Sequence, residues 1–305
     1  MFFVALLAAI LGSAVIFVWV PDRPLSELRA RWARPPSVFI SVQGIDVHLR
    51  DEGPSDDPSP VVLLHGTSAS LHTWEGWAAA LKTTRRVIRF DMPGFGLTGP
   101  SPDGNYTIER YTRFVLAMID ELGVRHCVIG GNSFGGYVAW VTALVAPDRV
   151  EKLILVDAGG YPLKSTTGPI GFRIARTPLV KNLIPFILPR SAIEQSLRNV
   201  YGDPKKVTSE LVDLYFDMTV RAGNRRALIE RFSQAPSDEA SDRVRELRVP
   251  TLIIWGGCDR LIDPSNAHRF HHDIMGSELV VFDDLGHVPQ EEAPEKTVAA
   301  VKQFI

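Results

Sequence analysis

The sequence has few cysteines and little net charge, and both features narrow the possible functions. It contains two cysteines, Cys127 and Cys258, which fall in different predicted elements and do not have metal-ligand spacing. We therefore expect free thiols in or near the core. The formal net charge is -2 over 305 residues, and no run of Lys and Arg occurs. This balance argues against a nucleic-acid partner.

Motifs for common cofactors are also missing. The sequence has no cluster with metal-ligand spacing and no Walker loop, and Gly94 and Gly96 stand in the wrong pattern for a dinucleotide fingerprint. We therefore expect no cofactor. With 45% hydrophobic and 22% charged residues, the composition is that of a globular protein with one sizeable core and room for an inserted subdomain.

The longest apolar run lies at the N-terminus. Residues 2–20 are uncharged and almost wholly apolar, and a helix of this length nearly spans a hydrocarbon core about 30 Å thick. The run predicts a membrane anchor. A cleaved signal peptide is the alternative, but it would need a charged n-region and a clear cleavage site. Arginines follow between residues 23 and 34, which favours a cytoplasmic catalytic domain. We expect a single-pass membrane protein that contacts lipid through this helix, with residues 1–36 as anchor and linker.

Short apolar strands alternate with helices over most of the remaining chain. Strands are predicted at 37–42, 45–50, 61–64, 86–90, 126–130, 152–156, 251–255 and 279–282. The alternation stops between residues 161 and 236, where the sequence is helical or irregular. We therefore predict an α/β fold with a mostly parallel, doubly wound sheet of about eight strands. Its core is expected to have two parts, 37–160 and 237–305, with a helical cap at 161–236 between them.

A glycine-rich turn follows the buried strand at 126–130. Residues 131–135 read Gly-Asn-Ser-Phe-Gly, the G-x-S-x-G pattern of a nucleophile elbow, in which a sharp turn exposes the serine. A serine hydroxyl becomes an effective nucleophile when a neighbouring imidazole accepts its proton. The imidazole in turn needs a carboxylate that holds its tautomer. Ser133 is therefore the candidate nucleophile.

The acid and the base are expected after later strands, in the order serine, acid, histidine. His287 follows the last predicted strand and is the candidate base. Asp259 stands just beyond the preceding strand and is the candidate acid. Asp263 is a weaker alternative, because a position shortly before a helix is more typical of a capping residue.

Backbone N–H groups must stabilise the oxyanion of the tetrahedral intermediate, and one such donor contributes about 3 kcal/mol. Phe134, directly after the serine, is predicted to supply one donor. The second is expected from the loop after His65 and Gly66, at Thr67 with Ser68 as the alternative. We expect His65 to brace this loop rather than to transfer protons.

Together these landmarks resemble the α/β-hydrolase fold superfamily over residues 37–305. They are His65-Gly66, Asp91 to Gly96, Gly131 to Gly135, Asp259 after residues 255–258, and Leu285 to His287. In this superfamily the acid can also follow the strand at 152–156, which makes Asp157 an alternative to Asp259. Epoxide hydrolases and haloalkane dehalogenases of this fold use an aspartate as nucleophile, so Ser133 is incompatible with their chemistry.

The resemblance implies a serine hydrolase that cleaves carboxylic esters with short to medium acyl chains through an acyl-enzyme. The partner would be a small ester or lipid-like substrate. The elbow also resembles that of carbon-carbon bond hydrolases of aromatic meta-cleavage products, which gives the alternative function. Those enzymes usually carry a glycine-proline-glycine type of sequence after His-Gly, whereas this chain reads Thr67 to Ser70. A non-catalytic binding protein on the same scaffold is disfavoured, because all three triad residue types are present.

The cap contains features that suit each substrate class. Arg173, Arg176 and Arg190 could face the carboxylate of a ring-cleavage product. The apolar residues between 172 and 188 suit an uncharged acyl chain better, since a buried arginine facing a neutral ester would cost free energy. We therefore expect esters to be the preferred substrates.

Overall fold

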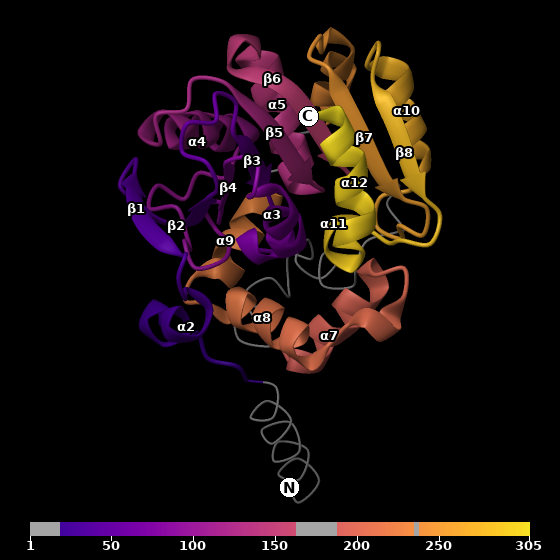
Figure 1. Cartoon of the computed structure of the whole chain (residues 1–305). Coiled ribbons are helices and arrows are strands. Elements are labelled where there is room, and N and C mark those ends of the chain that lie inside the picture. The colour runs from indigo at the N-terminus through magenta and orange to yellow at the C-terminus, as the bar shows by residue number, and fades with distance from the viewer. Residues whose placement is uncertain (1–18, 163–187, 235–237) are drawn as a thin grey trace, which may run out of the picture.

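The computed structural model describes residues 19–162, 188–234 and 238–305, and its centre is one twisted sheet (Figure 1). The strands are β1 (Val38–Val42), β2 (Ile45–Glu52), β3 (Val61–Leu64), β4 (Val87–Phe90), β5 (Cys127–Asn132), β6 (Val150–Val156), β7 (Thr251–Gly256) and β8 (Glu278–Phe282). They form an eight-stranded sheet in the order β1-β2-β4-β3-β5-β6-β7-β8. The pairs β1–β2 and β2–β4 are antiparallel, and the other neighbours are parallel. The predicted α/β fold with a mostly parallel sheet is confirmed.

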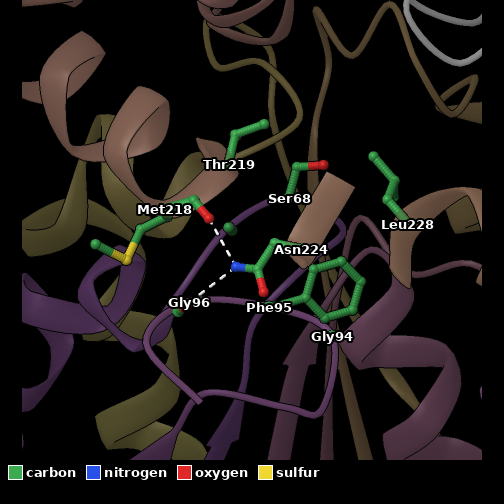
Figure 2. Close-up of a pocket in the computed structure, with 9 residues that line it drawn as sticks. Ser68, Gly94, Phe95, Gly96, Met218, Thr219, Asn224 and Leu228 are labelled. Carbon is green, nitrogen blue, oxygen red and sulfur yellow. Dashed lines mark hydrogen bonds between the residues drawn. The ribbon is translucent and has the colours of Figure 1, made fainter. Parts of the chain in front are cut away.

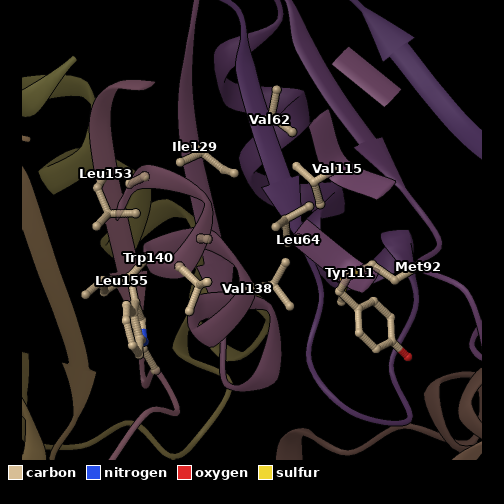
Figure 3. Packing of buried hydrophobic residues seen from close by; sticks show 14 of the residues in the cluster. Val62, Leu64, Met92, Tyr111, Val115, Ile129, Val138, Trp140, Leu153 and Leu155 are labelled. Atoms are coloured by element: carbon tan, nitrogen blue, oxygen red, sulfur yellow. The ribbon is translucent and has the colours of Figure 1, made fainter. Parts of the chain in front are cut away.

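Helices cover both faces of the sheet. One face packs against α4 (Ile108–Glu121), α5 (Phe134–Val145) and α10 (Ser265–Asp273), and the other against α3 (Glu75–Leu81) and α12 (Pro294–Phe304). Successive side chains of a strand point to opposite faces. In β3, Val62 and Leu64 therefore join the first core, and Val61 and Leu63 join the second. Figure 3 shows the first core, where strand residues face the helices α4 and α5.

Burial on both faces explains why the central strands read as continuous apolar runs. Every residue of β3, β5 and β7 is buried. The two cysteines are free thiols, Cys127 buried in β5 and Cys258 partly exposed just after β7. The core places the ends of β5, β6, β7 and β8 at one edge of the sheet, where the loops that carry the candidate site begin.

The described part of the predicted cap is helical. It comprises α7 (Arg190–Val200), α8 (Ser209–Val220) and α9 (Asn224–Ser233), and α7 and α8 lie at one end of the sheet (Figure 1). Residues 163–187 and 235–237 lie outside the described residues, and with them Arg173, Arg176 and most of the apolar stretch. The cap boundaries, 161 and 236, stay predictions. Other helical segments among the described residues are α11 (Pro289–Glu292) and short 3-10 segments at Leu71–Trp74, Pro147–Arg149, Pro204–Lys206 and Asp238–Glu246.

The segment before β1, predicted as a linker, contains a helix that docks on the cap. Helix α2 (Leu25–Trp32) buries Leu28 against Leu214 and Met218 of α8. Three donors converge on the buried carboxylate of Asp217: Arg23 at 2.7 Å, Arg31 at 2.9 Å and the indole of Trp32 at 2.8 Å. This part of the chain is therefore held to the cap by both apolar packing and ion pairs.

The predicted membrane localisation is contradicted. Across residues 19–162, 188–234 and 238–305, no helix combines the length and the apolar character needed to cross a bilayer. The predicted anchor at 2–20 falls almost entirely on residues 1–18, which lie outside the described residues. The arginines that suggested a membrane flank also have another role, since Arg23 and Arg31 pair with Asp217. We therefore withdraw the single-pass assignment and the lipid contact drawn from it.

Candidate active site

Ser133 stands at a sharp turn between β5 and α5. Its φ of 56° lies in the left-handed region, which is uncommon for residues other than glycine. Two glycines make this turn possible. A Cβ on Gly131 would lie 2.2 Å from the carbonyl oxygen of Gly135, and a Cβ on Gly135 would lie 2.2 Å from that of Leu64. The sequence therefore folds into a nucleophile elbow because only glycine allows strand and helix to approach this closely.

His287 and Asp259 form a buried hydrogen-bonded pair. Nδ1 of His287 lies 2.7 Å from Oδ2 of Asp259, and both side chains are almost inaccessible to solvent. Oδ1 of Asp259 accepts the N–H groups of Leu261 at 2.7 Å and Ile262 at 3.0 Å. These two backbone donors fix the orientation of the carboxyl group. The loop after β7 thus places the Asp259 carboxyl group against the ring of His287 in the loop after β8.

Asn132 connects the elbow to the histidine loop, a role that the sequence analysis did not assign. Its side-chain amide donates to the carbonyl of His287 at 2.9 Å and to that of Val156 at 3.2 Å. Within the described residues, Ser133 Oγ has no hydrogen bond to the His287 ring. Such bonds are often long in unliganded enzymes and shorten when substrate binds. The Asn132 bond keeps the two residues in neighbouring positions.

The predicted oxyanion-hole residues lie on both sides of Ser133. Phe134 is the first residue of α5, where helix geometry leaves the N–H without an intrahelical partner. On the other side, a Cβ on Gly66 would lie 3.2 Å from Cβ of Ser133, so the loop that continues into Thr67 passes directly beside the nucleophile. Ser68, the alternative donor, adopts a φ of 61° in the same loop.

His65 is built into this loop as a brace. Its Nδ1–H donates to the carbonyl of Gly66 at 2.8 Å, and its Nε2 accepts the N–H of Met92 at 3.0 Å. Both ring nitrogens are therefore engaged with backbone groups. Burial lowers the pKa of His65, which favours the neutral ring. This arrangement supports the expectation that His65 holds the loop and does not transfer protons.

Arg231 of α9 brings a positive charge to the loop from Gly66 to Ser70, which is called the oxyanion loop from here on because it contains the candidate donors Thr67 and Ser68. Its guanidinium donates to Oγ1 of Thr67 at 3.1 Å and lies 4.3 Å from the centre of the Phe134 ring. The residue is 8% exposed. No local sequence signal marks this arginine, because its contacts join segments 164 residues apart. The predicted candidate Arg190 instead binds Asp213 at 2.7 Å and the backbone of Ser209.

The alternative acids have other surroundings. Asp263 accepts the N–H of Ser265 at 2.9 Å, as a residue at the start of helix α10 does. Asp157 lies at the end of β6, and one ligand atom from each of Asp157, Asp259 and His287 lies within 4.8 Å of the others. Such a group could hold a metal ion, but Nδ1 of His287 and both Asp259 oxygens are already hydrogen-bonded. We therefore interpret it as a triad pair with a second carboxyl group beside it.

A small pocket opens next to the oxyanion loop (Figure 2). It is lined by Ser68, Ala69, Gly94, Phe95, Gly96, Met218, Thr219, Asn224 and Leu228. The amide of Asn224 is fixed by the carbonyls of Gly96 at 2.9 Å and Met218 at 2.7 Å. None of these lining residues is ionisable, so this pocket suits an uncharged group.

Comparisons with known proteins agree with this architecture. Residues 61–301 match the sequence model of the alpha/beta hydrolase family. A 2-hydroxy-6-oxo-2,4-heptadienoate hydrolase from Pseudomonas putida F1 is 30% identical over 277 residues, covering 88% of this chain and 95% of that protein. A 2-hydroxymuconate semialdehyde hydrolase from Pseudomonas putida is 29% identical over 275 residues, covering 87% and 92%. A solved meta-cleavage product hydrolase from Pseudomonas fluorescens IP01 has a TM-score of 0.74 at 27% identity, covering 88% and 96%.

Proposed function

Because the chain belongs to the alpha/beta hydrolase family, we propose that it is a serine hydrolase in which Ser133, His287 and Asp259 form the catalytic triad. The observation that carries this proposal is the buried 2.7 Å pair of His287 and Asp259, beside an elbow serine held at a positive φ. A pair of this kind gives the imidazole a defined tautomer, with Nδ1–H toward the acid and Nε2 free to accept a proton.

The reaction follows from these positions. Ser133 Oγ attacks the substrate carbonyl carbon while Nε2 of His287 takes the hydroxyl proton. The N–H groups of Phe134 and Thr67 stabilise the oxyanion. When the tetrahedral intermediate collapses, His287 gives the proton to the leaving alcohol and an acyl-enzyme remains. Water then attacks the acyl carbon, again with His287 as base, and releases the carboxylic acid and free Ser133.

We favour carboxylic esters with short to medium, uncharged acyl chains as substrates. The described side chains that line the small pocket beside Ser68 and Ala69 are all uncharged, which agrees with a neutral substrate, although the pocket's volume of about 10 Å³ admits only a water-sized group. The loop from Thr67 to Ser70 also lacks the glycine-proline-glycine type of sequence usual in the carbon-carbon hydrolases. A small-molecule ester is therefore the proposed partner, and the reaction as written needs no cofactor.

Carbon-carbon bond hydrolysis is the second candidate, and Arg231 favours it. A guanidinium beside Thr67 and Phe134 could bind the carboxylate of a dienoate ring-cleavage product. Two relatives of similar length are named for such substrates. In this reaction the same serine, histidine and aspartate act, but the bond that breaks joins the attacked carbonyl carbon to another carbon.

A labelled fluorophosphonate tests the triad without assuming a substrate. We expect the label on Ser133 after peptide mapping, and no label in Ser133→Ala. Labelling of Ser133→Ala at the wild-type rate would overturn the nucleophile assignment. A wild-type protein that resists labelling would support the third reading, a non-catalytic binding protein on this scaffold.

A comparison of esters with dienoates shows which type of bond the protein cleaves. We expect a higher kcat/KM for the best p-nitrophenyl ester than for any dienoate. A dienoate preferred tenfold or more, equivalent to ~1.4 kcal/mol in transition-state binding, would replace the ester proposal by the carbon-carbon one. In that case Arg231→Gln should reduce dienoate turnover far more than ester turnover.

A further inference from the structure

Asp157 occupies a buried and conformationally unusual position behind the triad. It follows the last residue of β6, is 0% exposed, and has a φ of 45°. Its Oδ1 accepts the N–H of Gly256 at 3.0 Å. The triad as described above gives this side chain no role, although a buried carboxyl group is costly unless its environment compensates for it.

Asp157 and Asp259 form a buried carboxyl pair, and such a pair is more stable when one of its two members is protonated. Ligand atoms of Asp157, Asp259 and His287 lie within 4.8 Å of one another. Two carboxylates this close and this deeply buried repel each other when both are ionised, and neither can then donate a hydrogen bond. Oδ2 of Asp157 has no partner among the described residues. A proton on one of the two groups removes the repulsion and supplies a donor between them, as in other buried carboxyl pairs.

The hydrogen bonds indicate which group is protonated. Asp259 accepts two backbone N–H groups and faces Nδ1 of His287, and these donors stabilise its charge. Asp157 accepts one backbone N–H. Burial, and then the charge of Asp259, raise the pKa of Asp157 well above its usual value, and Glu292 of α11 adds to the effect. Among the described residues, the titratable groups near Asp157 include two acids, Asp259 and Glu292, and the ring of His287.

We propose that Asp157 carries a proton at neutral pH and donates it in a hydrogen bond to Asp259, as a positioning residue of the triad. This inference rests on the proposed function, because its effect acts through Asp259 and His287. The neutral donor holds the Asp259 carboxylate in the orientation that receives Nδ1–H. It also draws charge away from His287, which moderates the basicity of the imidazole. The proton stays on Asp157 throughout the reaction.

The substitution Asp157→Asn separates a neutral from an ionised Asp157. An asparagine tolerates a positive φ, can accept from Gly256 through its oxygen, and can donate to Asp259 through its amide. It therefore resembles the protonated acid. We expect kcat/KM within about threefold of wild type and an unchanged acidic limb of its pH profile. If Asp157 were ionised, the substitution would remove a negative charge near His287 and move that limb about one unit or more toward lower pH, which would overturn the proposal.

The substitution Asp157→Ala removes the donor. We expect kcat/KM to fall by about tenfold or more, mainly through kcat. The acidic limb of the pH profile of kcat/KM should move to higher pH, because Asp259 without this donor makes His287 more basic. A loss confined to thermal stability, with the wild-type pH profile, would assign Asp157 a structural role only. Should this variant fail to fold, the asparagine comparison still decides.

An infrared measurement tests the proton directly. The full-length wild-type protein should have a protonated carboxylic-acid C=O band at neutral pH that is missing in Asp157→Asn. No lost band would overturn the proposal. This readout needs no turnover, so it can succeed even if fluorophosphonate labelling shows that Ser133 is not the nucleophile. The failure of the proposed function and the failure of this inference are thereby distinguishable.

Discussion

The side-chain amide of Asn132 is hydrogen-bonded to the backbone carbonyl of His287 at 2.9 Å. The residue before the candidate nucleophile thus holds the loop of the candidate base, although the two are 155 positions apart. The same amide binds the carbonyl of Val156 at the end of β6. One side chain therefore connects the ends of β5 and β6 with the loop after β8, from which Ser133, Asp157 and His287 extend.

Removing this connection should impair catalysis more than binding. In Asn132→Ala the carbonyl of His287 loses this donor while that of Val156 retains the N–H of Ser133, and the change costs about 1–3 kcal/mol. We expect kcat to fall by about 10- to 100-fold with a small change in KM, because His287 is no longer held beside the elbow. Steady-state kinetics and urea unfolding measure both effects. Unchanged kcat in a destabilised protein would mean that the contact supports the fold but not the reaction.

The proposed triad should behave as one unit. Ser133→Ala and His287→Ala are each expected to lower kcat by several orders of magnitude, and the double variant should be little worse than either single one. The reason is that the histidine has no proton to accept once the serine hydroxyl is gone. Kinetics on the best ester measure the three variants. Additive losses would show that the two residues act in separate steps and would contradict a shared mechanism.

Much of the fold was predictable because its signals are local. The buried strands appear as apolar runs, and the elbow appears as Gly131, Ser133 and Gly135, which are close in sequence because a tight turn requires it. The strand order then placed Asp259 and His287 at the same edge of the sheet, and the structure brings them together at 2.7 Å.

Contacts between distant segments were not predictable in this way. Arg231 reaches Thr67 only because the tertiary fold brings α9 beside the loop after β3, and Asp217 gathers three donors from residues more than 180 positions away. Helix α2 lies within residues 1–36, which were predicted as anchor and linker. Its apolar packing against α8 stabilises it, and intrinsic propensity alone does not indicate such a helix.

Glu292 is expected to couple the cap to the histidine loop. Its buried carboxylate accepts the N–H groups of Gly202 at 2.8 Å, Asp203 at 2.9 Å and Gly286 at 2.9 Å. Glu292→Gln replaces one acceptor by a donor, so at least one buried N–H loses its partner. We expect a loss of about 2–4 kcal/mol in unfolding free energy and a lower kcat, because Gly286 precedes His287.

The exposed Glu295 of helix α12 provides the matched control for Glu292. Glu295→Gln should change the free energy of unfolding by less than about 0.5 kcal/mol and leave kcat unchanged. Chemical denaturation and ester kinetics on both variants make the comparison. Equal changes in unfolding free energy and kcat for the two variants would show that the Glu292 carboxylate does not couple the cap to the histidine loop.

Asp217 is expected to hold helix α2 on the cap. Asp217→Asn weakens charge-assisted hydrogen bonds to Arg23 and Arg31, and we expect a loss of about 1–3 kcal/mol. Trypsin should then cleave faster after Arg29 and Arg31, since the helix detaches more often. Time courses of limited proteolysis, with the exposed Glu210→Gln as control, measure this effect. Wild-type cleavage rates in Asp217→Asn would show that the other contacts of this segment, among them the packing of Leu28 and the Arg31–Asp213 pair, hold the helix without Asp217.

His72 should make the fold sensitive to mild acid. Burial first, and then the positive charge of Arg50, lower the pKa of His72 from 6.5 to about 4 against the opposing effect of Asp91. Between these two values the unfolded chain binds a proton that the folded protein does not. Stability is therefore fully present above about pH 6.5 and falls as the pH falls toward 4, by at most about 3 kcal/mol from this residue.

The substitution His72→Gln removes the titrating ring and can still donate to the carbonyl of Trp32, which the ring contacts at 3.1 Å. Its unfolding free energy should consequently fall less steeply than that of wild type between pH 6.5 and 4. His268→Gln, at an exposed position of α10, should keep the wild-type slope. Urea unfolding at several pH values, followed by tryptophan fluorescence, gives these slopes. If the folded protein excludes a proton from His72, the unfolding free energy of wild type must fall more steeply with pH than that of His72→Gln. Parallel slopes in all three proteins would therefore show that another group dominates the acid sensitivity.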